Sequence, residues 1–182
     1  VKDAMRPYLE ENFGNPSTNY IYGQRAKEAV KKAREQVAAL IGALPDDIVF
    51  TSGGSESDNQ AIIGTALAHA DKGKHIVTSR IEHPAVIKTC CYLEERLGFS
   101  VTYVPVDGAG LVNPRDVQEA ITDKTILITI MHANNEVGTI EPIAEIGDIA
   151  RKHKIAVHTD AAQSCGKVEV DVKWLKVDLL TL

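Results

Sequence analysis

Apolar residues recur along the early part of this chain with the spacing of an α-helix. The stretch between Gly23 and Gly42 repeats them every three or four residues, and they fall on one stripe of a helical wheel. The stripe consists of Ala26, Val30, Ala33, Val37, Leu40 and Ile41. The pattern predicts an amphipathic helix that ends near Gly42.

From residue 48 onward, short β-prone apolar runs alternate with helical stretches. Strands are predicted at 48–50, 75–79, 101–105, 126–131 and 155–159, and helices at 56–69, 85–97, 114–121 and 143–153. Repeated units of this kind predict an α/β fold, with a mostly parallel sheet and helices on both faces. The chain has no linker-like tract or internal repeat, so we expect residues 1–182 to form part of one domain. The apolar run at 177–182 has no following helix, so we expect that domain to continue.

Composition narrows the class of protein. With 44% hydrophobic and 25% charged residues, the chain resembles an ordinary globular domain. The net charge is -5 and the 20 Lys and Arg residues are spread along the chain, so we expect no nucleic-acid or membrane surface. Small molecules or proteins are the expected partners. The absence of a signal-like apolar core and the presence of only three cysteines lead us to expect a cytoplasmic protein.

The segment Gly53-Gly54-Ser55-Glu56 lies where a predicted strand meets a predicted helix. The free N–H groups of a helix N-terminus bind phosphate, and glycines let an anion approach the backbone closely. Ser55 is a candidate both for the N-cap and for a hydroxyl donor to a phosphate. An ordinary capped turn explains the same residues. The segment matches neither of the usual glycine-rich nucleotide motifs.

Asp160 follows the last predicted strand of the alternation, within HTDAAQ. Parallel sheets bind their ligands at this carboxyl edge. A carboxylate in such a poorly solvated place needs a cationic partner, and a protonated pyridine nitrogen is one. Capping of the next turn is the alternative. His158 and Asp160 also suggest metal ligands, but no second ligand cluster has suitable spacing, so we expect no metal.

Two further polar turns follow predicted strands. In MHANNEVG, two amides and an acid crowd a turn, which also suits a purely structural loop. In RIEHPAV, His83 precedes a proline that starts a helix, where a histidine is often a cap or a surface residue. Together the four turns would open on one edge of the sheet. A phosphate site, an imidazole, an amide and an acid would then converge there.

These segments carry a family resemblance. FTSGGSESDN, EHPAV, MHANNEVGT and HTDAAQSCGK, with GNPS near the start, resemble successive signature blocks of the cysteine desulfurases. That family belongs to the class V aminotransferase superfamily, whose members have the fold-type I architecture and use pyridoxal 5'-phosphate. The resemblance covers the chain and implies that it is the N-terminal part of such an enzyme.

The resemblance also implies roles for individual residues. Gly54 and Ser55 would hold the cofactor phosphate, and His83 would stack on the pyridine ring and take part in proton transfers. His83 is therefore the expected catalytic residue.

Three more residues would complete the shell around the ring. Asn135 would contact cofactor or substrate, Asp160 would pair with the pyridine nitrogen, and Gln163 would bind the phenolic oxygen. An ionised Asp160 keeps the ring nitrogen protonated, which makes the cofactor an electron sink.

The implied reaction converts L-cysteine to L-alanine and leaves the sulfur on an enzyme cysteine as a persulfide, for iron-sulfur cluster or thio-cofactor assembly. The resemblance further implies a homodimer and a protein that accepts the sulfur. The cofactor-binding lysine, the persulfide cysteine and the carboxylate-binding arginine are expected outside these residues. Cys90, Cys91 and Cys165 are interpreted as structural.

Two alternatives stay open. Tyr20 stands where many family members have histidine, whereas selenocysteine lyases and some desulfurases have tyrosine, so the substrate preference is open. A selenocysteine lyase or another class V enzyme with the same cofactor shell is the nearest alternative. An inactive fragment or binding piece is the alternative of another class. The isolated chain is expected to be inactive.

Overall fold

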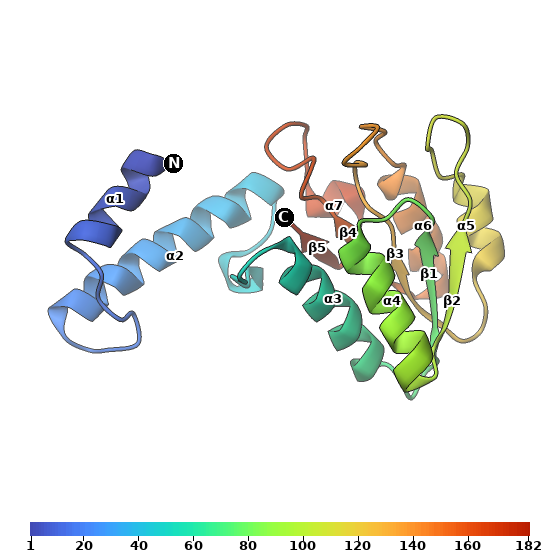
Figure 1. Cartoon of the computed structure of the whole chain (residues 1–182), viewed down its shortest axis with the longest axis horizontal. Coiled ribbons are helices and arrows are strands. Elements are labelled where there is room, and N and C mark those ends of the chain that lie inside the picture. Colours follow the sequence, from blue (N-terminus) through green and yellow to red (C-terminus); the bar gives the residue numbers. More distant parts are fainter. The chain divides into compact units, whose positions relative to one another are not determined.

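The computed structural model describes residues 1–182 and divides into two compact units, 1–49 and 50–182. The first unit contains the helices α1 (Lys2–Glu10) and α2 (Ile21–Ile41) and the 3-10 turn η1 (Pro45–Asp47). Figure 1 colours this unit in blue. That residues 1–182 belong to a single cofactor-binding domain stays a prediction.

The predicted first helix is confirmed. α2 ends at Ile41, and Gly42 follows it in the left-handed conformation with φ of 70°, its N–H bonding to the carbonyl of Ala38. The apolar stripe is only partly covered, because Ala26 and Ile41 are buried whereas Leu40 is exposed.

The second unit is built on a five-stranded sheet (Figure 1). The strands are β1 (His75–Ser79), β2 (Ser100–Val104), β3 (Thr125–Thr129), β4 (Ala156–Asp160) and β5 (Leu179–Thr181). Their order is β2-β1-β3-β4-β5, and every pairing is parallel. The predicted α/β class with a parallel sheet is confirmed.

Helices cover both faces of the sheet, as Figure 1 shows. One face carries α3 (Gly54–Ala68) and α4 (Pro84–Leu97), and the other carries α5 (Pro114–Ala120), α6 (Ile143–His153) and α7 (Val172–Leu175).

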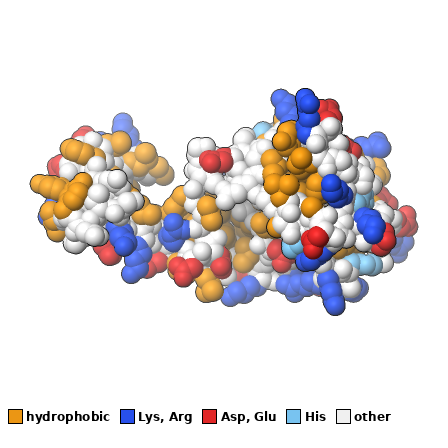
Figure 2. All heavy atoms as spheres, turned by 90° about the horizontal axis from the view of Figure 1, so that it is seen from below, with side chains coloured by type: hydrophobic (Ala, Val, Ile, Leu, Met, Phe, Trp, Pro, Cys, Tyr) orange, Lys and Arg blue, Asp and Glu red, His pale blue; other side chains and the backbone are white.

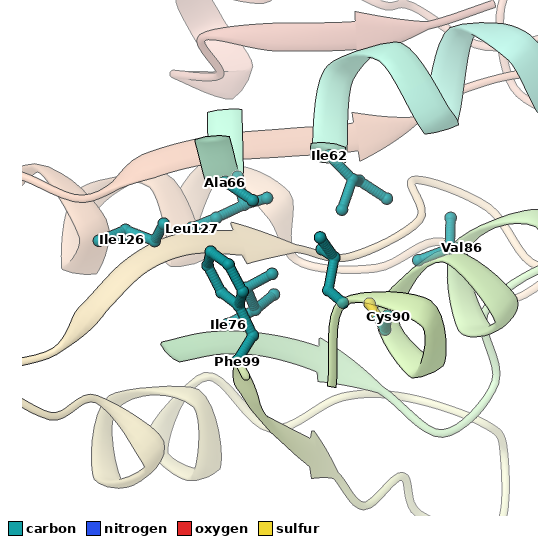
Figure 3. Close-up of a cluster of buried hydrophobic side chains, with 9 residues drawn as sticks. Ile62, Ala66, Ile76, Val86, Cys90, Phe99, Ile126 and Leu127 are labelled. Atoms are coloured by element: carbon teal, nitrogen blue, oxygen red, sulfur yellow. The ribbon is translucent and has the colours of Figure 1, made fainter. Parts of the chain in front are cut away.

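The core under α3 and α4 is a single apolar cluster (Figure 3). Ile62 and Ala66 from α3, Ile76 from β1 and Cys90 from α4 are all fully buried in it. Burying one such Ile side chain stabilises a fold by roughly 1.5–3 kcal/mol, so this contact fixes α3 firmly on the sheet. The position of its N-terminus follows from that packing.

The face drawn in Figure 2 shows no strong segregation of charge. Lys, Arg, Asp and Glu side chains intermingle on it. None of the helices combines the length and the apolar character needed to cross a membrane.

The strand predicted at 48–50 is wrong. Ile48 has extended dihedrals, but its N–H bonds back to the carbonyl of Pro45 in η1, and no strand pairs with the segment. A β-prone run forms a strand only where a neighbouring strand takes up its backbone groups, so composition alone misleads here. Gly53 and Gly54 therefore follow a segment that is not a strand.

The strand predicted at 126–131 begins and ends earlier, at Thr125 and Thr129. The physical reason lies in the next residues, because the N–H of Met131 donates to the carboxylate of Glu82 instead of to a neighbouring strand. A side chain thus ends the pairing with β1, while the N–H groups of Ile130 and His132 still donate to the carbonyls of His158 and Asp160 in β4. Helices α1 and α7 were not predicted.

Candidate functional site

The parallel sheet brings the candidate turns to one edge. β1, β3 and β4 run in the same direction, so the residues that follow them leave the sheet at its carboxyl end. Figure 1 shows the loops after β2, β3 and β4 rising from that edge. The order changes direction between β1 and β3, which is the position where such sheets bind ligands.

The N-terminus of α3 reaches the same edge through β5. Ser57 Oγ lies 3.0 Å from Thr181 Oγ1, and a Cβ on Gly54 would lie 3.7 Å from Thr181 Cγ2. Gly53 is the N-cap and has no side chain to occupy the free N–H groups of the first turn. The expectation that Ser55 is the N-cap is therefore wrong. Ser55 lies inside the first turn, exposed, with its hydroxyl unbonded.

Asp160 is a buried carboxylate at the end of β4, only 8% exposed. Its Oδ1 accepts a hydrogen bond of 2.9 Å from the N–H of Ala162, so the turn-capping interpretation is confirmed. That bond is its only one, and no Lys, Arg or His forms an ion pair with it. A buried carboxylate with so few partners is incompletely compensated, and a cation would complete it.

His83 is the N-cap of α4. Its Nδ1 accepts a hydrogen bond of 3.1 Å from the N–H of Ala85, as expected for a capping residue. A neutral imidazole bonded in this way carries its proton on Nε2. The ring is half-buried, and its Nε2 forms no hydrogen bond within the protein.

The loop after β3 divides its two amides between different environments. Asn134 is buried, and its Oδ1 accepts from the N–H groups of Glu136 and Val137 at 2.9 and 3.0 Å, closing the turn. Asn135 is exposed and its side chain makes no hydrogen bond. The structural interpretation thus applies to Asn134, and the functional one can apply to the adjacent Asn135.

Gln163 lies on the surface after β4. Its Oε1 accepts a hydrogen bond of 3.2 Å from Nζ of Lys167, four residues later in the chain. The residue follows Asp160 closely, but nothing holds its side chain toward the site.

Two further buried groups belong to this region: Asp58, which sequence reasoning missed, and His158, which it considered only as a metal ligand. Asp58 on α3 and His158 on β4 are 1% and 0% exposed, with Asp58 Oδ1 3.7 Å from His158 Nε2. Burial, reinforced by the charge of Asp160, raises the pKa of Asp58 to about 7. Burial lowers the pKa of His158 to about 4. His158 and Asp160 share a face of β4 because strand side chains alternate, a signal that the sequence did contain.

Glu82, the residue before His83, is like Asp58 a buried acid near Asp160. Burial is the main cause that raises the pKa of Glu82 to about 8, and the charge of Asp160 adds to it. Asp160 therefore lies among carboxyl groups whose own ionisation is suppressed. A cation bound at Asp160 would offset the repulsion among the carboxyl groups of Asp58, Glu82 and Asp160.

These residues fit pyridoxal phosphate. The uncapped first turn of α3 suits its phosphate, the unpaired Asp160 suits a protonated ring nitrogen, and the half-buried imidazole of His83, bonded only through Nδ1, suits the ring. The three come from separate elements that meet at one sheet edge.

The cysteines lie outside this arrangement. Cys90 is buried in the core cluster, and burial raises the pKa of its thiol to about 12. Burial also raises the pKa of Cys165. A thiol in such surroundings is a poor nucleophile, which supports a structural role.

Sequence comparison connects the chain to known proteins. Residues 1–182 match the family Aminotransferase class-V. A cysteine desulfurase IscS of Methanosarcina thermophila is 57% identical over 182 residues, which are 100% of this chain and 45% of that protein. A cysteine desulfurase IscS of Dictyoglomus turgidum is 53% identical over 182 residues, or 100% of this chain and 46% of its relative. The chain thus spans about half the length of the curated relatives it matches.

Solved structures give the same picture. SspA in complex with cysteine superposes with a TM-score of 0.94 at 46% identity, covering 99% of this chain and 52% of that one. DndA from Streptomyces lividans superposes with a TM-score of 0.87 at 37% identity, covering 98% and 49%.

Proposed function

The chain belongs to the class V aminotransferase family, and from this premise we propose that the protein containing it is a cysteine desulfurase dependent on pyridoxal phosphate. It would act on L-cysteine, release L-alanine and pass the sulfur to an acceptor. Identities of 57% and 53% to cysteine desulfurases over the whole chain support this activity above others of the family.

The observation that carries the proposal is the buried Asp160, which forms one hydrogen bond and no ion pair. Pyridoxal phosphate, when bound, supplies an electron-withdrawing ring that stabilises the negative charge left on Cα of an amino acid after its proton leaves. Asp160 would hold the protonated ring nitrogen, which strengthens that effect. The turn after Gly53 would bind the phosphate through Gly54 and Ser55.

The remaining site residues would orient the ring and handle protons. His83 would lie against the ring and exchange a proton at Nε2, because its Nδ1 is occupied by the cap. Asn135 and Gln163 would donate their amide N–H groups to cofactor or substrate oxygens. The sulfur-accepting nucleophile is not among Cys90, Cys91 and Cys165 in this proposal.

The proposal includes a homodimer, a sulfur-accepting or scaffold protein and a role in iron-sulfur cluster or thio-cofactor assembly, in the cytoplasm. The family resemblance supports the dimer, the acceptor and the role in assembly, and the small number of cysteines supports the cytoplasmic location.

A direct assay tests the activity. The full-length protein is incubated with pyridoxal phosphate, L-cysteine and a thiol reductant, and alanine and sulfide are measured. Equal amounts of the two products are expected. Absence of alanine would contradict the proposal, and strong preference for L-selenocysteine would favour the lyase alternative.

The role of Asp160 is tested by Asp160→Asn. The asparagine keeps an Oδ1 acceptor for the N–H of Ala162 but removes the charge, so we expect alanine formation to fall at least about tenfold, the rate change that ~1.4 kcal/mol produces. Cofactor affinity, measured by fluorescence, should fall as well. Asp171→Asn is the matched control, because Asp171 Oδ1 also accepts from an N–H two residues later, that of Lys173. If both variants lowered alanine formation and cofactor affinity equally, Asp160 would have no part in the cofactor site.

A further inference from the structure

The loop after β1 and the loop after β3 are joined by buried hydrogen bonds that run in both directions. The N–H of Met131 donates to the carboxylate of Glu82, with 3.0 Å to Oε1 and 3.0 Å to Oε2. In return, Asn134 Nδ2 donates to the carbonyl of Ile81 at 3.0 Å. These hydrogen bonds hold the two loops together at Ile81 and Glu82, which are successive residues of the loop after β1.

Glu82 is held from its own side as well. Ser79 Oγ donates to Glu82 Oε1 at 2.5 Å, and the same Oγ accepts from the N–H of Ile81 at 3.3 Å. The Glu82 side chain is buried and takes part in no ion pair. A buried acid without a cation is costly, and hydrogen bonds from Ser79 and Met131 are what offset that cost.

The residue that this arrangement fixes is His83. Its backbone follows Glu82 directly, and its ring is held through Nδ1 by the N–H of Ala85. The loop on the opposite side carries Asn135, directly after the buried Asn134. The imidazole and the exposed amide thus extend from two loops whose separation the buried bonds determine.

We propose that Glu82 is a positioning residue, which together with Asn134 holds His83 and Asn135 at a fixed spacing across the cofactor site. The proposal rests on the proposed function and adds two residues to it. Because burial raises the pKa of Glu82 to about 8, the side chain acts through its hydrogen bonds rather than through a permanent charge. A neutral side chain with the same acceptor should therefore replace it.

Three variants separate these contributions. Glu82→Ala removes both acceptors and leaves two donors, the N–H of Met131 and the O–H of Ser79, without an acceptor. Glu82→Gln keeps one oxygen acceptor and no charge. Asn134→Asp keeps the Oδ1 acceptor for the turn but loses the donor to the carbonyl of Ile81. If Glu82→Ala fails to fold, the other two variants still test the proposal.

The matched control lies at the opposite edge of the same strands. Thr125 is buried, and its hydroxyl bonds to His75 Nδ1 at 2.7 Å and to the N–H of Thr122 at 2.8 Å. Thr125→Val therefore breaks a buried polar tie of similar size far from the site. It should lower thermal stability without changing turnover.

The first readout is independent of activity. In the protein labelled on histidine, the ring resonances of His83 are recorded by carbon–proton correlation NMR, with and without pyridoxal phosphate. Glu82→Ala and Asn134→Asp should shift these resonances, whereas Thr125→Val should not. Unmoved His83 resonances in both site variants would overturn the positioning role even if the protein never turned over cysteine.

The second readout is turnover in the full-length protein. We expect Glu82→Ala to lower kcat about 10- to 100-fold with little change in KM, because small misplacement of a catalytic group has effects of this size. Glu82→Gln should restore kcat to within about threefold of the parent. Failure of Glu82→Gln to restore it, or an equal loss in Thr125→Val, would contradict the proposal. Absence of turnover in the parent would contradict the proposed function alone.

Discussion

At the scale of single residues, the two roles of His83 can be measured separately. His83→Asn keeps an oxygen that accepts from the N–H of Ala85, so α4 should lose under about 0.5 kcal/mol of stability. The loss of the imidazole should still lower turnover about 10²-fold or more. His83→Ala should lower turnover in the same way, and because it also removes the cap it should lower the free energy of unfolding by about 1 kcal/mol. Urea unfolding and the alanine assay give both quantities.

The control for this cap is Asn113, whose side chain accepts from the N–H of Arg115 at the start of α5. Asn113→Ala should also cost about 1 kcal/mol but leave turnover unchanged. If His83→Asn were as active as the parent, the imidazole would have no part in the chemistry.

Residues whose importance depends on local pattern were predictable, and those that depend on burial were not. Asp160 follows from its position after a strand, and His83 from its place before a proline. Glu82 and Asn134 stand beside predicted residues, but only the packed loops show that both are buried and that each bonds to the backbone of the opposite loop. Asp58 lies within a helical stretch where the sequence offers no sign that it faces His158.

At the scale of elements, regular periodicity predicted most helices and strands of the second unit closely, although it missed α7. The strand at 75–79 and the helix at 143–153 have the predicted bounds. The errors occur where tertiary contacts decide, at 48–50 for want of a neighbouring strand and at Met131 because of the Glu82 carboxylate. Hydrophobic spacing contains neither kind of information.

Two helical glycines should respond in opposite directions to alanine. Nothing lies within 4 Å of a Cβ added at Gly64 in α3, so Gly64→Ala should stabilise the protein by about 0.5–1 kcal/mol. At Gly147 in α6, the added Cβ would lie 2.8 Å from the carbonyl oxygen of Leu175, so Gly147→Ala should destabilise by about 1–3 kcal/mol. Urea unfolding of both variants measures the difference. Stabilisation by Gly147→Ala would disprove the close approach of α6 to the turn after α7.

At the scale of the whole molecule, the buried acids make the stability of the cofactor-free protein depend on pH. Burial raises the pKa of Asp58 to about 7 and that of Glu82 to about 8. In the unfolded chain, carboxyl groups titrate near about 4. The folded state therefore holds protons that the unfolded state has already lost, and this stabilisation disappears as pH rises through the folded pKa values.

His158 acts in the opposite direction but in another range. Because its pKa is lowered to about 4 by burial, its contribution to stability grows as pH rises from about 4 through the ordinary histidine range near 6.5 and levels off above that range. His75 and His132, whose pKa burial also lowers, act in the same direction. The acids therefore dominate the upper part of the window from about pH 6.5 to 8, where an unfolded histidine is already mostly neutral. Glu141, whose pKa burial also raises, adds to the same direction.

We therefore expect the free energy of unfolding to fall between pH 6.5 and 8, by roughly 1 kcal/mol per pH unit for each proton retained only in the folded state. Urea titrations of the cofactor-free protein at several pH values in this window measure the slope. Glu82→Gln removes one titrating group and should flatten the curve, whereas Asp171→Asn, which removes an acid from the N-cap of α7, should leave its slope unchanged. Stability that stayed level or rose across the window would mean that Asp58 and Glu82 are ionised in the folded protein. Asp160 would then lie beside two further negative charges, and cation binding there would be stronger than the neutral neighbours allow.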